Sequence, residues 1–159
     1  MMTVPGRIMA LDVGDVRTGV ALSDPLQMIA SPHSVVREPS LDKTIAALAR
    51  LIRETEAVRV VVGLPLDREG RPGPQARKVQ GFIERLRAAC PVEIVTQDER
   101  FTTAESQRAL IAADCSRKKR KQVVDKLAAS VILQGYLAAH RPNHHPEGLS
   151  EEDGEKGEG

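Results

Sequence analysis

The sequence predicts a single α/β domain in which helices pack against a mixed β-sheet. Three apolar or β-branched segments follow one another near the N-terminus with only short connections. After them, helix-like and strand-like segments alternate, and a long amphipathic segment closes the domain. A chain of 159 residues is long enough for one well-buried core and too short for two ordinary domains.

The N-terminal segments predict a three-stranded antiparallel meander. Turn-forming residues at 14–17 and at Asp24-Pro25 divide them, and connections this short join antiparallel rather than parallel strands. The expected strands cover 7–13, 18–23 and 29–36.

The rest of the domain predicts helices and strands in alternation. Ser40 or Asp42 can cap a first helix, and the pattern T-x-x-E at Thr102 and Glu105 is a capping box that opens another. The run 58–62, which is apolar except for Arg59, is typical of a central strand buried on both faces. The expected elements are a helix over 41–55 (Ile45, Leu48, Leu51 and Ile52 inward), a strand over 58–62, a helix over 75–89 (Val79, Phe82, Ile83 and Leu86 inward), a strand over 92–96, a helix over 102–113 and a helix over 116–139.

The acidic C-terminal tail separates from a basic body. Residues 142–159 hold six acids and one base among prolines and glycines, so we expect a disordered tail after a domain spanning 1–141. Without the tail, 22 basic residues face 16 acidic ones, a net charge of +6. Such a body favours a polyanionic partner, although a well-solvated domain reaches the same charge without one.

Cysteines, hydropathy and aromatic residues exclude several classes of protein. The two cysteines, Cys90 and Cys115, lack metal-ligand spacing, and no stretch is apolar enough to cross a bilayer, so we expect a cytoplasmic protein with reduced thiols and no membrane partner. Two phenylalanines, one tyrosine and no tryptophan argue against a module that binds single strands mainly by stacking bases.

Three acidic residues from separate segments predict a metal site. Asp12 ends an apolar strand, Glu99 follows the strand expected over 92–96, and Asp125 lies in the last helix. Carboxylates gathered in this way repel one another unless cations lie between them, and Mg²⁺ prefers such oxygen ligands. Two bridged ions can hold the attacking and leaving oxygens of a phosphodiester, so the pattern predicts a metal-dependent nuclease.

Each acid also has a structural interpretation. Asp12 can be a turn aspartate that bonds its own backbone, and Glu99 or its neighbour Asp98 can favour the positive end of the following helix. Neighbouring strand residues face opposite ways, so only one of that pair should enter the pocket; we choose Glu99 and keep Asp98 in reserve. A helical projection puts Asp125 at the border of the apolar stripe, where an acid paired with a lysine lies equally well. The expected stripe consists of Val124, Leu127, Ala128, Val131 and Gly135.

A run of five cations opens the last helix. Basic residues at a helix N-terminus oppose the helix dipole, so helix propensity does not explain them, whereas contacts to phosphates would. A solvated basic face is the alternative. The run consists of Arg117, Lys118, Lys119, Arg120 and Lys121.

Four segments together resemble the YqgF family of ribonuclease H-like proteins, also called RuvX. They are LDVGDVRTGVALSDP (11–25), VVGLPLDREGRPGPQA (61–76), DERFTTAES (98–106) and SRKKRKQVVDKLAASVILQGYL (116–137). The resemblance covers residues 6–140. It implies a ribonuclease H-like fold with a five-stranded mixed sheet flanked by helices on both faces, and a site for Mg²⁺ or Mn²⁺, with two ions expected, built from Asp12, Glu99 and Asp125.

The resemblance also implies a role for the protein. It points to maturation of the 5′ end of pre-16S ribosomal RNA in the cytoplasm, with the assembling small ribosomal subunit as a possible partner. Arg17, Arg100 and the run 117–121 would bind nucleic acid. Cleavage of four-way (Holliday) DNA junctions is the alternative, and it would favour a homodimer over a monomer. A third hypothesis is a non-catalytic nucleic-acid-binding factor in ribosome assembly.

Overall fold

Five strands form one mixed sheet in the computed structural model, which describes residues 4–99 and 117–140 and, within 117–126, only the helix backbone. The strands are β1 (Arg7–Val13), β2 (Thr18–Ser23), β3 (Ala30–Val36), β4 (Ala57–Leu64) and β5 (Glu93–Asp98). Their order across the sheet is β3-β2-β1-β4-β5. The pairs β1–β2 and β2–β3 are antiparallel, and the pairs β1–β4 and β4–β5 are parallel. The expected meander and five-stranded mixed sheet are confirmed.

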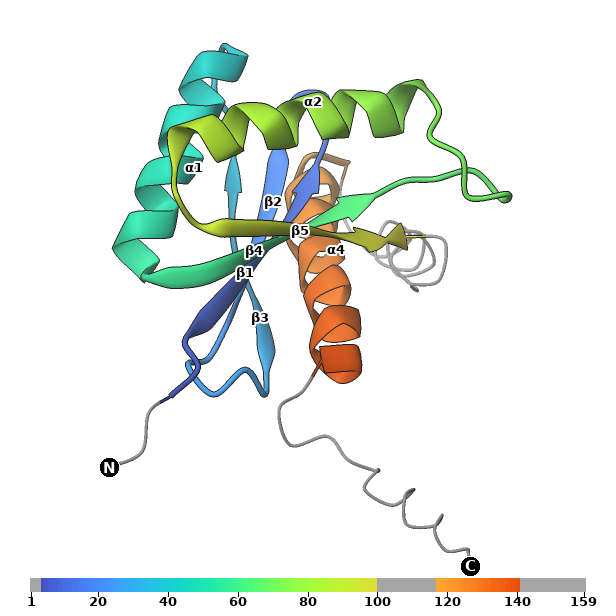
Figure 1. The fold of residues 1–159 in the computed structure, drawn as a ribbon. Coiled ribbons are helices and arrows are strands. Elements are labelled where there is room, and N and C mark those ends of the chain that lie inside the picture. Colours follow the sequence, from blue (N-terminus) through green and yellow to red (C-terminus); the bar gives the residue numbers. More distant parts are fainter. Residues whose placement is uncertain (1–3, 100–116, 141–159) are drawn as a thin grey trace, which may run out of the picture.

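Helices cover both faces of this sheet. The described helices are α1 (Leu41–Thr55), α2 (Pro74–Ala89) and α4 (Arg117–His140). Helices α1 and α2 lie over one face and α4 over the other, as Figure 1 shows. Ser40 caps α1, because its Oγ accepts a hydrogen bond from the backbone N–H of Lys43 at 3.2 Å.

Alternation along the strands divides the core between the two faces. In β1, Met9 and Leu11 pack with α1 and α2, whereas Ile8 and Ala10 pack with α4. In β4, Val61 belongs to the α4 face, and its neighbours on either side belong to the opposite face. Because side chains alternate with a period of two, this pattern fixes the face toward which each strand end directs its next residue.

The buried face of α4 differs from the predicted stripe. Ala128 is buried as expected, but Leu127, Val131 and Gly135 are only half-buried. The residues that fill the core on this side are Ala129, Ile132, Leu133, Tyr136 and Leu137. The projection was wrong because apolar residues lie on more than one face of this helix, and the contact with the sheet decides which of them are buried. Position 125 lies four residues, about one turn, before Ala129, on the line of the buried stripe rather than at its border.

Several predictions fall on residues outside the described ranges. They concern Arg100, the helix over 102–113 and the tail over 142–159. The boundary between a domain over 1–141 and a tail stays a prediction for the same reason. Among the helices that the structure describes, none has the length and apolar character needed to cross a membrane.

Candidate active site

Asp12 lies near the end of β1 on the face that α4 covers. It is half-buried and pairs with Gly19 of β2 across the antiparallel ladder. The strand then closes in a tight turn, in which the N–H of Gly14 donates to the carbonyl oxygen of Arg17 at 2.9 Å. A β-carbon at position 14 would come within 2.8 Å of that oxygen, so the turn requires glycine. The turn keeps bulk away from the backbone beside the Asp12 carboxylate.

Glu99 follows the last residue of β5, and its side chain turns back over β4. A β-carbon at Gly63 would lie 2.5 Å from Glu99 Oε2 and 2.6 Å from Ile132 Cδ1. The Glu99 carboxylate therefore occupies space that exists only because residue 63 is glycine. Ile132 belongs to the core under α4, so this half-buried carboxylate lies on the α4 face of the sheet.

Strand register brings Asp12 and Glu99 close together. Leu11 pairs with Val62 in the parallel β1–β4 ladder, so the next step of the same register places Asp12 beside Gly63. Adjacent strands are about 4.8 Å apart, and the Glu99 carboxylate lies on the α-carbon of Gly63. The two acids thus share one face and one end of the sheet. Asp98 lies four residues after Ile94, so the two share a face of the strand, and Ile94 packs on the α1 and α2 side. Asp98 therefore belongs to the face opposite to that of Asp12 and Glu99.

The third acid comes from the helix that covers this face. Position 125 is about one turn before Ala129, which is fully buried against the sheet, and α4 packs mainly across β2, β3 and β1 and also contacts β4. The Asp125 side chain and those of the run 117–121 lie outside the description, although their backbone forms the first turns of α4. Among the side chains that are described, no three acidic, histidine or cysteine groups come together as a metal site. Arg17, the other predicted nucleic-acid contact, is half-buried at the end of the turn after Asp12.

Arg59 braces α4 against the sheet below this site. Its guanidinium donates to Glu93 Oε1 at 2.9 Å and to the Tyr136 hydroxyl at 3.0 Å. Burial disfavours the charge on Arg59, but the hydrogen bond to Glu93 and the contact with Tyr136 outweigh it and raise the pKa of the guanidinium. The brace joins β4, β5 and α4, the three elements that carry Gly63, Glu99 and Asp125.

The donor set fits a hard divalent cation. Asp12 and Glu99 supply carboxylate oxygens at the same end of one sheet face, and both are half-buried. Carboxylates this close disfavour one another's ionised form, and a cation between them removes that penalty. The glycine at position 63 leaves open the space that the Glu99 carboxylate needs.

Two features of the site were not predicted from the sequence. The expected strand over 58–62 stops before Gly63, whereas β4 continues to Leu64 and Gly63 makes room for Glu99. The available signal was a glycine inside an apolar strand, which often marks a close approach of another group. The contact between Arg59 and Tyr136 joins residues distant in the sequence and gave no signal.

Known proteins resemble this chain over most of its length. The family model RuvX, described as Holliday junction resolvase, matches residues 6–139. A protein of Desulforamulus reducens named "Putative pre-16S rRNA nuclease" is 48% identical over 131 residues, which are 82% of this chain and 96% of the relative. A protein of the same name from Roseiflexus sp. is 43% identical over 141 residues, which are 89% of this chain and 100% of the relative.

Solved structures show the same fold at low identity. RuvC of T. thermophilus in complex with a Holliday junction substrate aligns with a TM-score of 0.52 at 15% identity, over 84% of this chain and 94% of that chain. The Holliday junction resolvase of fowlpox virus aligns with a TM-score of 0.51 at 14% identity, over 84% of this chain and 99% of that chain. These likenesses confirm the predicted ribonuclease H-like α/β architecture.

Proposed function

The chain belongs to the RuvX family, whose model spans residues 6–139, and on this premise we propose that it is a divalent-metal-dependent nuclease that matures the 5′ end of pre-16S ribosomal RNA. The observation that carries the proposal is the meeting of Asp12 and Glu99 on the α4 face of the sheet. Family relatives named as pre-16S ribosomal RNA nucleases support the choice of substrate. The same role implies work in the cytoplasm beside the assembling small subunit.

The chain's own residues have separate tasks in this proposal. Asp12, Glu99 and Asp125 hold the metal. The site takes two ions, either Mg²⁺ or Mn²⁺. When bound, the metal lowers the pKa of an attacking water and offsets charge on the phosphodiester oxygens. Gly63 leaves the space that the Glu99 carboxylate occupies. Arg17, Arg100 and the cations of 117–121 bind the phosphates on either side of the cleaved bond.

A cleavage assay with two substrates tests the proposal. Wild type and Asp12→Asn each receive a pre-16S ribosomal RNA fragment and a four-way DNA junction, with Mg²⁺ present or chelated by EDTA. Loss of one ligand oxygen's charge should lower the rate on the order of 10²-fold or more, because several kcal/mol of transition-state stabilisation depend on the metal. We expect metal-dependent cleavage of the RNA alone, absent in the variant, while circular dichroism shows an unchanged fold.

Cleavage of four-way DNA junctions is the second candidate, and the description of the matching family model favours it. Symmetric cleavage of a junction needs two active sites, so a homodimer in solution together with cleavage of the junction alone would replace the RNA proposal. Binding of RNA without cleavage, both by the wild type and by Asp12→Asn, would instead favour a non-catalytic role in ribosome assembly.

A further inference from the structure

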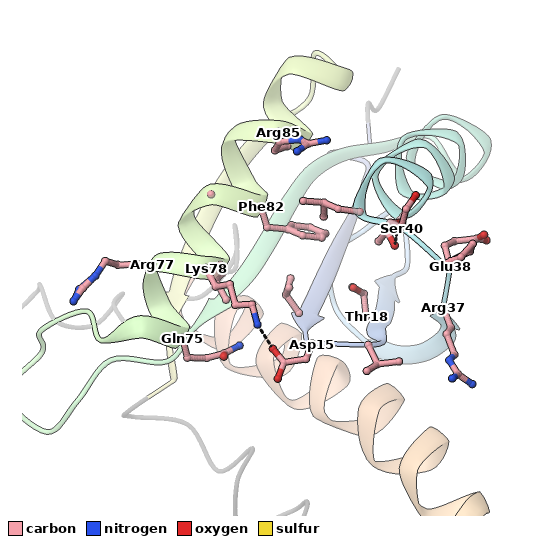
Figure 2. A pocket seen from close by; sticks show the side chains of 18 residues that line it. Asp15, Thr18, Arg37, Glu38, Ser40, Gln75, Arg77, Lys78, Phe82 and Arg85 are labelled. Atoms are coloured by element: carbon pink, nitrogen blue, oxygen red, sulfur yellow. Dashed lines mark hydrogen bonds and ion pairs between the residues drawn. The ribbon is translucent and has the colours of Figure 1, made fainter.

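A second concave surface lies on the opposite face of the sheet from Asp12 and Glu99. It is a groove of about 920 Å³ between the turn after β1, the connection from β3 to α1, and helix α2. Figure 2 shows it from close by. Val13 and Gly14 line this groove, and they follow Asp12 directly in the chain. The turn over 14–17 is therefore the ridge that separates the predicted metal site from this groove.

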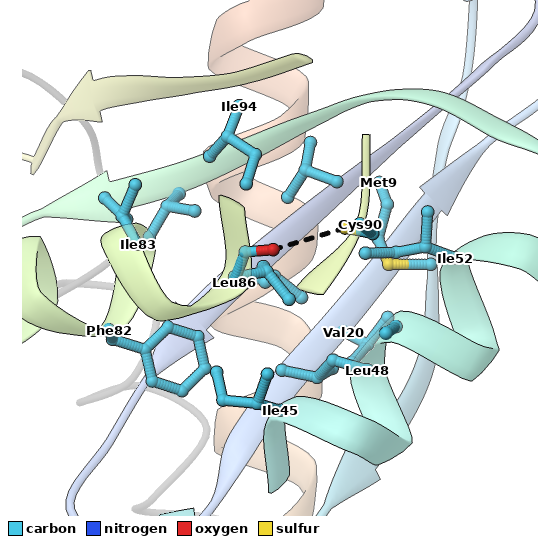
Figure 3. Packing of buried hydrophobic residues seen from close by; sticks show 14 of the residues in the cluster. Met9, Val20, Ile45, Leu48, Ile52, Phe82, Ile83, Leu86, Cys90 and Ile94 are labelled. Carbon is cyan, nitrogen blue, oxygen red and sulfur yellow. Dashed lines mark hydrogen bonds between the residues drawn. The ribbon is translucent and has the colours of Figure 1, made fainter. Parts of the chain in front are cut away.

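The floor of the groove is apolar and part of the core. Val79 and Phe82 of α2 line it, and both belong to the hydrophobic cluster under α1 and α2 (Figure 3). Val13 and Leu41 add apolar surface from the β1 end and from the start of α1. Because this floor is anchored in the core, it is a preformed surface on which a planar group can pack.

The rim of the groove carries four cations from two segments of the chain. They are Arg37, Arg77, Lys78 and Arg85, and all four are exposed. Lys78 and Arg85 lie seven residues apart on α2, which corresponds to about 10 Å along a helix axis. Figure 2 shows Arg37 across the groove from them. Lys78 and Arg85 are thus spread along α2, whereas a site for one phosphate would bring its cations to a point.

The rim cations are available to an incoming anion. Lys78 Nζ lies 2.5 Å from Asp15 Oδ1, with both side chains more than 60% exposed, and Arg85 pairs with the still more exposed Asp42. Ion pairs as exposed as these contribute little to stability, so exchanging them for phosphates costs little. Within the described part of the chain, Arg37 and Arg77 form no ion pair.

We propose that this groove binds the single-stranded part of the nucleic acid next to the cleaved bond. The strand passes over the turn at 14–17, with its phosphates on the rim cations and a base on the apolar floor. A single strand fits because the faces of its bases are free to pack on that floor, whereas the bases of a duplex are paired and stacked on one another. The inference rests on the proposed function in taking nucleic acid as the occupant, but it concerns binding and not cleavage.

The test measures binding of a fluorescent single-stranded RNA by anisotropy at several salt concentrations, in EDTA so that no cleavage occurs. The variant Arg37→Gln/Arg77→Gln removes two rim cations. Arg50→Gln/Arg53→Gln is the matched control, because it removes two exposed α1 arginines that do not line the groove. Each lost phosphate contact lowers the slope of log affinity against log salt by about 0.7 for single strands, so the groove variant should lose about 1.4. The control should keep the wild-type slope.

Two results would overturn the proposal. One is a groove variant whose affinity and salt slope equal those of the control. The other is adenosine monophosphate that binds the wild type through Arg37 and Arg77 without displacing the RNA, since the groove would then be a small-molecule site. Failure of the nuclease proposal looks different: the wild type would bind RNA through the groove and yet cleave nothing when Mg²⁺ is added.

Discussion

The Glu99 carboxylate lies against the α-carbon of Gly63, with Oε2 only 2.5 Å from where a β-carbon would stand. This contact places an acid that follows β5 over β4, next to the strand that carries Asp12. This geometry depends on the absence of a side chain at position 63 and on the alternation of side chains between the two faces along β1 and β4. It leads to a first prediction about position 63.

Gly63→Ala should displace Glu99 and lower cleavage strongly. The added methyl would also meet Ile132 Cδ1 at 2.6 Å, so the free energy of unfolding should fall by about 1–3 kcal/mol, as for other overpacked cores. The double variant Gly63→Ala/Ile132→Val separates the two effects, because valine lacks Cδ1. It should regain part of the stability in thermal unfolding while cleavage stays low. Recovery of cleavage together with stability would show that Glu99 is not displaced.

Asp12→Asn should remove the stabilisation of the protein by Mg²⁺, because the variant lacks one of the proposed metal ligands. A ligand that binds only the folded state raises its stability, so adding Mg²⁺ should raise the melting temperature of the wild type and not that of the variant. Differential scanning fluorimetry with and without EDTA measures both. If Mg²⁺ raised the melting temperatures of wild type and variant equally, Mg²⁺ binding would not depend on Asp12.

Tyr136→Phe should weaken the brace between α4 and the sheet. The variant removes the hydroxyl that accepts from Arg59 at 3.0 Å and keeps the ring that stacks on His140. The expected loss is about 1 kcal/mol in the free energy of unfolding, measured by urea denaturation. In an Arg59→Met background the same change should cost much less. An equal cost in both backgrounds would mean that the hydrogen bond contributes nothing.

The loop between β2 and β3 should lose stability in acid. Burial opposes ionisation of Asp24, but backbone N–H groups of Ile29, Met28 and Leu26 donate to its carboxylate and hold its pKa below the ordinary value. A lowered folded-state pKa stabilises the protein above the unfolded pKa of about 3.9, and this contribution disappears as pH falls through the folded value.

Asp24→Asn tests this linkage, because the amide nitrogen cannot accept the bond from Leu26. The variant should be less stable than the wild type at pH 7, and the difference should shrink as the pH falls below about 4. Urea denaturation at several pH values measures it. If the difference in the free energy of unfolding between the two proteins did not change with pH, ionisation of Asp24 would not be its cause.

The sequence was sufficient for most of the fold because its signals are local. Period-two alternation, the cap at Ser40 and the turn residues after β1 and β2 each act over a few positions, and the structure has the elements they predict. The same alternation led us to expect only one of Asp98 and Glu99 in the pocket; the Glu99 carboxylate lies on the α4 face, and its role as a metal ligand stays a prediction.

The features that the sequence did not predict depend on contacts between distant segments. The register of α4 is set by how Ile132, Leu133 and Tyr136 pack against the sheet, mainly over β1, β2 and β3, which a helical projection does not include. The space at Gly63 has meaning only once Glu99 reaches it. The groove on the other face is built from three segments, and its rim cations Arg37 and Arg85 have no pattern along the chain.

The central claim is that Asp12, Glu99 and Asp125 hold the same metal, and Mn²⁺ binding tests it most directly. Electron paramagnetic resonance measures free Mn²⁺ during titration of the wild type, Asp12→Asn, Glu99→Gln, Asp125→Asn and Asp98→Asn. Asp98 is the matched control, because it neighbours Glu99 but belongs to the opposite face of the sheet. The account predicts weaker Mn²⁺ binding, and loss of cleavage, in the first three variants and wild-type behaviour in Asp98→Asn. Wild-type Mn²⁺ binding in Glu99→Gln, or a loss confined to Asp98→Asn, would contradict it.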